Sequence, residues 1–164
     1  MKTSLKCAVV AFAAFIATTS AFAQEWTKAQ KEVWQVVEDS WTKWKSGDVT
    51  GSIACVHEKY QGWSDDTPLP ITKDQVTQWF QAMKEIMKVE FFYLNPARIL
   101  VTENAAVVDY YYSFGATYTR GEKKEMKESE GKNAEFYIKE GGKWLLIGDM
   151  TIHKTKDNDK EDDE

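Results

Sequence analysis

The hydrophobic pattern of this chain changes its period once, near Val89, and this change limits the folds that the chain can adopt. Before it, apolar residues recur at steps of three and four, which is typical of amphipathic helices. After it, aromatic and β-branched residues form short runs between turn signals at "NP", "TEN", "RGEKK" and "EGG", which is typical of strands. Three helices followed by four or five strands indicate an α+β fold with an antiparallel sheet.

The first predicted helix carries an aromatic stripe and ends near Ser46 and Gly47. Helical spacing places four tryptophans on one side of it: Trp26, Trp34, Trp41 and Trp44. A stripe of this kind normally packs against a core, and the alternative is an exposed platform for a sugar or a peptide.

Two shorter helices are predicted after it. Asp48 is a good N-cap for a helix that runs to about Val56, and Thr72 with Gln75 has the pattern of a capping box at the start of the next. The stretch between them, residues 57–70 ("HEKYQGWSDDTPLP"), has neither helical nor strand period. We interpret it as the rim of a pocket, with a catalytic loop as the second interpretation.

Each predicted strand has one apolar or aromatic face, which we expect to pack on the helices. These faces consist of Ala106, Val108, Tyr110, Tyr112 and Phe114, of Ala134, Phe136 and Ile138, and of Trp144, Leu146, Gly148, Met150 and Ile152. The opposite faces hold Val107, Tyr111, Tyr137, Leu145 and Ile147, and are more apolar than a solvated sheet face requires. A homodimer through this outer face is therefore predicted.

Residues 1–23 have the plan of a secretory signal peptide. Lys2 and Lys6 precede an uncharged run over residues 7–16, and small residues end in "AFA" before Gln24. The apolar run is shorter than the roughly 20 residues that span a membrane. We expect cleavage after Ala23, export to the periplasm or the extracellular space, and no membrane partner.

Charge and cysteine content exclude several function classes. The net charge is −5, and residues 155–164 contain six of the 26 acidic residues, so they predict a disordered acidic tail that serves solubility or, alternatively, weak cation binding or tethering. The remaining domain, residues 24–154, is nearly balanced in charge and lacks a nucleic-acid footprint. Cys55, the one cysteine left after cleavage, has no disulfide partner and is interpreted as a buried thiol rather than a nucleophile.

Motifs for covalent, nucleotide or metal chemistry are missing. The chain has no Gly-x-Ser-x-Gly and no glycine-rich phosphate loop. Its two histidines, His57 and His153, lie in different elements without further ligands at close spacing, so a metal site has little support. We expect no cofactor and no metal.

Several segments together resemble a known superfamily. These are the Trp-rich first helix, "GDVTGSIACVHEKYQGWSDDTPLP", the aromatic third helix, "AAVVDYYYSF" and "EGKNAEFYIKEGGKWLLIGD". Over about residues 28–152 the chain looks like the SnoaL-like branch of the nuclear transport factor 2-like superfamily, to which ketosteroid isomerases belong. The resemblance implies a cone in which a strongly bent antiparallel sheet wraps three N-terminal helices and leaves a pocket for a small, often hydrophobic molecule.

The resemblance also implies candidate residues, and this chain departs from the pattern at two of them. Asp109 and Met150 stand where such chains often carry histidine. The pocket is expected to be lined by His57, Tyr60, Trp63, Trp79, Tyr110, Tyr112 and Met150. Asp65 or Asp109 is the candidate general base, because a carboxylate desolvated in an aromatic pocket has a raised pKa. Asp65 and the adjacent Asp66 are also ordinary turn formers before Thr-Pro.

The sequence leads to one function and two alternatives. The first is an exported domain that binds a small apolar or aromatic molecule without an identifiable reaction. The second is a cofactor-independent isomerase, dehydratase or hydrolase that uses a pocket aspartate as base. The third is a non-catalytic protein-interaction module whose cone is filled by its own side chains. Fold alone does not decide among them.

Overall fold

A computed structural model describes residues 25–154 of the chain. Two helices come first, two strands and a third helix follow, and four long strands end the described chain. They are α2 (Lys28–Lys45), α3 (Val49–Ile53), β1 (Val56–Ser64), β2 (Ile71–Thr72), α4 (Lys73–Lys84), β3 (Met87–Val101), β4 (Ala105–Arg120), β5 (Lys123–Glu140) and β6 (Lys143–His153). The α+β class is confirmed. The predicted signal peptide, residues 1–23, and the predicted acidic tail, residues 155–164, lie outside the described residues.

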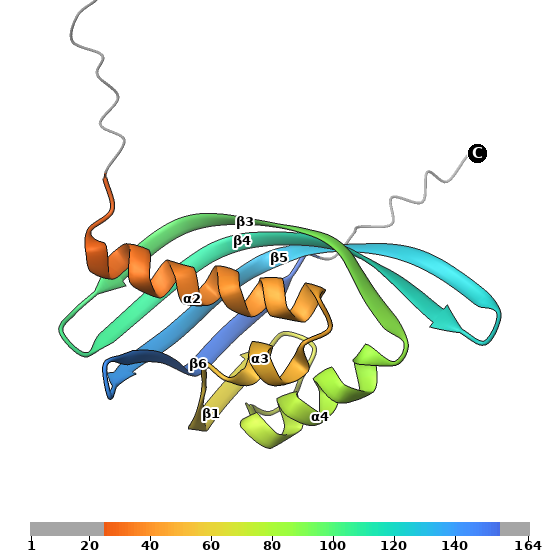
Figure 1. The fold of residues 1–164 in the computed structure, drawn as a ribbon, viewed down its shortest axis with the longest axis horizontal. Coiled ribbons are helices and arrows are strands. Elements are labelled where there is room, and N and C mark those ends of the chain that lie inside the picture. The colour runs from red at the N-terminus through yellow and green to blue at the C-terminus, as the bar shows by residue number, and fades with distance from the viewer. Residues whose placement is uncertain (1–24, 155–164) are drawn as a thin grey trace, which may run out of the picture.

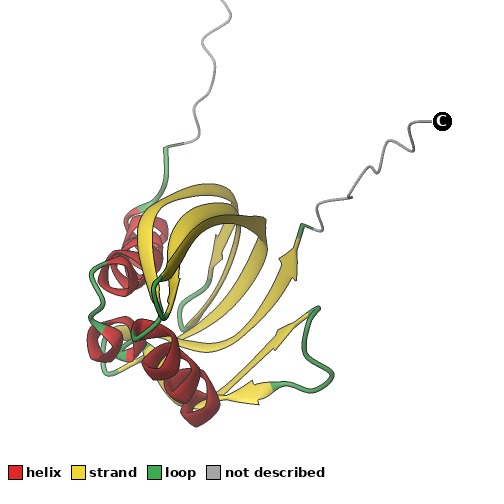
Figure 2. Ribbon diagram, turned by 90° about the vertical axis from the view of Figure 1, so that its right-hand side faces the viewer, coloured by secondary structure: helices red, strands yellow, loops and turns green. Residues whose placement is uncertain are grey.

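The strands form one six-stranded sheet in the order β2-β1-β6-β5-β4-β3. The pairs among β3, β4, β5 and β6 are antiparallel, as predicted, and β1 adds a parallel pair with β6, so the sheet as a whole is mixed. The sheet is strongly curved and open, with the helices on its concave side (Figures 1 and 2). This is the cone that the sequence predicts.

Helix α2 crosses the concave face of the sheet (Figure 1). Its tryptophan stripe packs against the core there, as predicted. Its N-cap Thr27 and Gln30 form a capping box that satisfies free backbone N–H groups at the helix start. Trp34 is buried against Tyr110, with ring centroids 5.8 Å apart, and Trp41 and Trp44 pack on Phe114. The stripe is therefore part of the core, and the alternative of an exposed platform is wrong.

The shorter helices also begin where the sequence predicts. Asp48 caps α3 and accepts a hydrogen bond from the Gly51 N–H, although the helix ends at Ile53, before the predicted Val56. Thr72 and Gln75 form the capping box of α4. None of the helices in residues 25–154 is long and apolar enough to cross a membrane.

Residues 57–64 are a strand, which corrects the predicted loop. They belong to β1, which pairs with β6 on one side and β2 on the other. The register of β1 against β6 shifts between Val56 and Gln61, so the alternation of buried and exposed side chains is interrupted. Because of this irregularity, the sequence of β1 lacks the strict alternation of apolar and polar residues that predicts a strand.

The "NP" pair at Asn95 and Pro96 is not a turn but lies inside the long strand β3. β3 is at the edge of the sheet, where a proline without a backbone N–H is tolerated. The register shifts again next to it, between Pro96 and Arg98.

The inner face of β5 is the opposite of the predicted one. Asn133, Glu135 and Tyr137 are buried, whereas Phe136 is 43 % exposed on the convex side. Pairing explains the orientation, because Glu135 is the register partner of Val108, which is fully buried on the inner face of β4. The mixed polar face packs on the helices here because its polar atoms bond to one another.

The inner face of β6 changes side along the strand. Trp144 and Leu146 are buried, as predicted. The register against β5 then skips one residue at Ile147, since Phe136 pairs with Gly148 and Tyr137 pairs with Leu146. Beyond this bulge the alternation is inverted. Asp149, Thr151 and His153 therefore turn inward, and Met150 and Ile152 turn outward, against the prediction.

Candidate functional site

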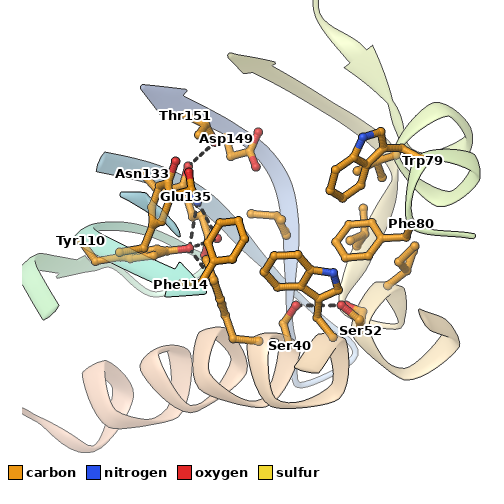
Figure 3. Close-up of a pocket in the computed structure, with 18 of the residues that line it drawn as sticks. Ser40, Ser52, Trp79, Phe80, Tyr110, Phe114, Asn133, Glu135, Asp149 and Thr151 are labelled. Carbon is orange, nitrogen blue, oxygen red and sulfur yellow. Dashed lines mark hydrogen bonds between the residues drawn. The ribbon is translucent and has the colours of Figure 1, made fainter. Parts of the chain in front are cut away.

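A cavity of about 380 Å³ opens between the concave face of the sheet and the helices. Its wall is rich in aromatic rings, which come from Trp41, Trp44, Tyr60, Trp79, Phe80, Tyr110, Tyr112, Phe114 and Tyr118. Figure 3 shows Trp79 and Phe80 of α4 on one side and the polar groups of β5 and β6 on the other. The volume lies within the roughly 300–1,000 Å³ of small-molecule sites. A cone filled by its own side chains would leave no space of this size.

Glu135 is the centre of a buried hydrogen-bond network on the inner face of the sheet. Its Oε1 accepts hydrogen bonds from the Tyr110 hydroxyl at 2.7 Å and from Asn133 Nδ2 at 3.0 Å. Its Oε2 accepts one from the Tyr137 hydroxyl at 2.5 Å. We call Tyr110, Asn133, Glu135 and Tyr137 the Glu135 network, and Figure 3 shows its members Tyr110, Asn133 and Glu135. Three donors directed at one carboxyl favour its ionised form.

Further contacts fix this network in place. The Tyr110 hydroxyl accepts hydrogen bonds from Trp41 Nε1 at 3.1 Å and from Asn133 Nδ2 at 2.9 Å. The Asn133 side-chain oxygen accepts one from the Thr151 hydroxyl at 2.7 Å. The orientation of the Tyr110 ring is therefore set from α2 and from β6, and a ligand meets a preformed polar surface.

The pKa of Glu135 is nevertheless raised to about 7. Burial is the largest cause and the nearby charge of Asp149 adds to it, whereas hydrogen bonds from Tyr137, Tyr110 and Asn133 partly offset the shift. The desolvation cost exceeds the effect of the three donors. Glu135 thus exchanges its proton near neutral pH, within the range in which a carboxyl acts as both acid and base.

Asp149 is the second carboxyl of the cavity. The pKa of Asp149 is raised to about 6, because burial outweighs the hydrogen bonds from the Tyr60 hydroxyl and the Trp63 backbone that lower it. The Tyr60 hydroxyl donates to Asp149 Oδ1 at 2.9 Å. Gly62 makes this contact possible, because a Cβ there would lie 2.0 Å from the Tyr60 hydroxyl and 2.4 Å from Asp149 Oδ1.

Comparisons with known proteins identify the fold. A ketosteroid isomerase-like protein from Erwinia carotovora atroseptica superposes with a TM-score of 0.67 at 11 % identity, over 79 % of this chain and 99 % of that one. An NTF2-like protein from Cytophaga hutchinsonii gives 0.65 at 11 % identity, over 78 % and 100 %. This chain has the NTF2-like fold. A conserved protein from Planctomyces limnophilus gives 0.70 at 13 % identity, over 77 % and 96 %.

Sequence comparison adds nothing to this result, since no family model and no curated protein matches the chain. The structural likeness confirms the fold that the sequence resemblance implied, and at such low identity it concerns the fold alone. Any function of this NTF2-like domain has to be argued from its own cavity.

Four of the predicted pocket residues line the cavity of this NTF2-like domain. They are Tyr60, Trp79, Tyr110 and Tyr112. Trp79 is about half exposed at the mouth, whereas the other three are buried. Burial, with a smaller contribution from the charges of Asp65 and Asp66, raises the pKa of Tyr112 to about 12.

Trp63, Met150 and Asp109 do not line the cavity, because they lie on the convex face of the sheet. Trp63 and Met150 are register partners and are each almost half exposed. Met150 is turned outward by the bulge at Ile147, and with Asp109 it borders a shallow hollow on that face. Asp109 pairs there with Arg98.

His57 and Asp65 also lie outside the cavity lining. His57 is near the start of β1, and its Nε2 is 3.4 Å from a carboxyl oxygen of Glu140. Asp65 follows β1 and contacts His153, with 2.7 Å between Asp65 Oδ1 and His153 Nδ1. Hydrogen bonds from His153 lower the pKa of Asp65, the opposite of the desolvation expected for a pocket base.

One group of side chains within residues 25–154 could hold a metal ion. Asp65, Asp66 and His153 place their ligand atoms within 4.8 Å of one another. Two of the three are exposed, and His153 reaches the cavity mouth. Cys55 is not part of any such group, and burial raises the pKa of its thiol, which disfavours the nucleophilic thiolate.

Sequence reasoning missed Glu135 and Asp149, the two carboxyls that do line the cavity. The assignment of the apolar strand faces to the core placed both on the outside. Glu135 stands between Ala134 and Phe136, so alternation alone places it on the outer face. The bulge that turns Asp149 inward is likewise not encoded in the alternation.

Proposed function

We propose that this NTF2-like domain binds a small, largely apolar molecule in its cavity. The observation that carries the proposal is the combination of an aromatic wall with a few polar groups gathered at one side, Glu135, Asn133 and Asp149. Ligand sites typically bury most of the ligand against apolar surface and use a few polar groups to orient it. The preformed hydrogen bonds of the Glu135 network lower the cost of ordering on binding.

The test is to purify the protein from its native host and identify retained small molecules by mass spectrometry. Val76→Trp on α4 should displace them, because Val76 lines the cavity and the larger ring occupies it. Gln78→Trp is the matched control, since Gln78 is exposed on the same helix. Equal retention by both variants would contradict binding in the cavity.

Proton transfer on the bound molecule is the second candidate function. It is favoured by the raised pKa of Glu135, about 7, and of Asp149, about 6, beside the Tyr110 and Tyr60 hydroxyls. A carboxyl near neutral pKa abstracts a proton next to a carbonyl. Once that carboxyl is protonated, the tyrosine hydroxyl that donated to it can turn its proton to the oxygen that becomes negative. This mechanism replaces the one with Asp65 or Asp109 as base.

Deuterium incorporation into small ketones in D₂O, followed by NMR, tests this candidate. Glu135→Gln should slow exchange by about 100-fold or more if Glu135 is the base. Asp109→Asn is the matched control, because Asp109 lies on the convex face. Exchange at the wild-type rate in Glu135→Gln excludes Glu135 from the chemistry.

We also propose that the domain forms a homodimer through the convex face of its sheet. The outer apolar surface consists of Trp63, Tyr93, Leu100, Tyr111, Phe136, Met150 and Ile152, each between 43 % and 68 % exposed. Exposed apolar side chains gathered on one face are typical of interfaces. Sedimentation equilibrium should give a dimer that Phe136→Glu dissociates, and a monomeric wild type would refute the proposal.

Export is proposed from the N-terminal pattern of residues 1–23. N-terminal sequencing of the protein from a periplasmic or extracellular fraction should find Gln24 as the first residue. A retained Met1 would refute cleavage.

A further inference from the structure

The charged side chains that line the cavity are almost all acidic. Among the residues that the structure describes, Glu135 and Asp149 line it, and no lysine or arginine does. His153, at the mouth, is the one basic side chain in the lining, and it is already in contact with Asp65. The cavity thus combines a negative electrostatic potential with an aromatic wall.

Glu135 and Asp149 also lack the partner that buried carboxylates usually have. Among residues 25–154, none of the ion pairs includes either of them. Buried charges in proteins are normally paired with an opposite charge, because hydrogen bonds alone do not recover the cost of desolvation. The donors around Glu135 are neutral hydroxyl and amide groups.

A ligand with a positive charge would match both the negative potential of the cavity and its unpaired carboxylates. An ammonium group supplies the missing positive charge and donates hydrogen bonds to carboxylate oxygens. Aromatic faces such as those of Trp41, Tyr60 and Trp79 attract cations through the ring quadrupole and also cover an apolar ligand body. A neutral molecule leaves the carboxylates unpaired, and an anion is repelled by them.

We propose that the ligand of this cavity is a small aromatic amine in its protonated form, with its ammonium group at Glu135 and Asp149 and its ring against the aromatic wall. The proposal rests on the proposed binding function and specifies the chemical class of its ligand. A one-ring or two-ring amine suits a cavity of about 380 Å³, near the lower end of the range for ligand sites.

The test compares three probes of similar size by isothermal titration calorimetry at pH 8. They are 2-phenylethylamine, which is a cation, 2-phenylethanol, which is neutral, and phenylacetate, which is an anion. The amine should bind at least about tenfold more tightly than the alcohol, because hydrogen bonds to charged groups contribute this much. Phenylacetate should bind most weakly of the three.

Variants then locate the effect. In the double variant Glu135→Gln and Asp149→Asn, the advantage of the amine over the alcohol should disappear while the alcohol retains its affinity. Asp109→Asn makes the same chemical change on the convex face and should leave the amine affinity unchanged. Circular dichroism reports whether each variant is folded, and the wild-type comparison of the three probes stands without any variant.

The outcomes separate the two proposals. Binding of 2-phenylethanol as tight as that of the amine overturns the amine assignment and leaves the binding function in place. Absence of binding by all three probes overturns both. If the double variant still binds the amine more tightly than the alcohol, the amine assignment is also overturned, because the preference then does not come from Glu135 and Asp149.

Discussion

Strands β4 and β5 are neighbours in register over their whole length, but their inner faces differ in kind. The inner face of β4 is apolar and aromatic around Val108, which is fully buried. Directly beside it, β5 buries Glu135 with Asn133 and Tyr137. β4 therefore follows the rule that hydrophobic side chains drive burial, and β5 departs from it.

The difference shows that the inner face of β5 contributes less to the stability of the fold than an apolar face would. A buried carboxyl without a counter-ion is destabilising, even when three donors satisfy it. An apolar residue at position 135 would cost less and would need no Tyr110 or Tyr137 hydroxyl. A local arrangement that reduces stability and faces a cavity is characteristic of a functional site.

The largest effect is expected when a carboxylate is introduced on the inner face of β4, where β5 already has one. Val108→Asp places a second carboxylate beside Glu135, but without donors arranged to receive it. We expect the free energy of unfolding to fall by about 3–5 kcal/mol, measured by urea denaturation. Met126→Asp, at an exposed site of β5, should cost less than about 1 kcal/mol. Equal losses would mean that the inner face of β4 tolerates charge.

The reverse change, Glu135→Gln, removes the carboxyl from β5. The folded-state pKa of Glu135, about 7, lies above its ordinary value of 4.5. The wild type therefore keeps the associated stability below pH 4.5 and loses it as the pH rises to 7, in total about 3 kcal/mol. Relative to the wild type, Glu135→Gln should gain stability over this interval in urea denaturation.

The control for the pH series is Glu103→Gln, which removes an exposed carboxyl from the turn between β3 and β4. Its stability should follow the wild type at every pH. A constant difference between the wild type and Glu135→Gln from pH 4.5 to 8 would contradict a raised pKa of Glu135.

Tyr60→Phe tests the hydrogen bond to Asp149, the second carboxyl of the cavity. Loss of the hydroxyl removes a hydrogen bond that lowers the pKa of Asp149, so this pKa should rise above about 6. We expect a loss of about 2 kcal/mol at pH 8, where Asp149 is ionised. Carbon-13 NMR titration of the Asp149 carboxyl measures the shift. Tyr93→Phe, on an exposed ring, should change neither quantity.

The smallest effect is expected when an ion pair on the convex face is removed. Asp109 and Arg98 form a partly exposed ion pair, which water and salt screen. Arg98→Ala should therefore cost at most about 1 kcal/mol in thermal or urea denaturation. A loss as large as that of Val108→Asp would mean that the two faces of the sheet do not differ in the way described.

Much of the fold could be predicted from the sequence because its signals are local. The tryptophan stripe of α2, the capping box at Thr72 and the alternation of β4 each lie within one element. The order of helices before strands then leaves few architectures. Of the residues predicted to line a pocket, Tyr60, Trp79, Tyr110 and Tyr112 border the cavity.

The carboxyls of the candidate site could not be predicted, because their positions depend on pairing between strands. Asp149 faces inward only because β6 skips a residue against β5 at Ile147. Glu135 faces inward because β5 is in register with β4, which outweighs the more apolar opposite face around Phe136. The strand character of residues 57–64 depends in the same way on β6.

The position of Pro96 near the middle of β3 has a consequence for solubility. β3 is a 15-residue strand at the sheet edge, where free backbone groups invite pairing with another chain. Proline removes one donor from that edge, and the adjacent shift in register bends the strand there. The longest outer margin of the sheet is thus a poor template for fibril growth.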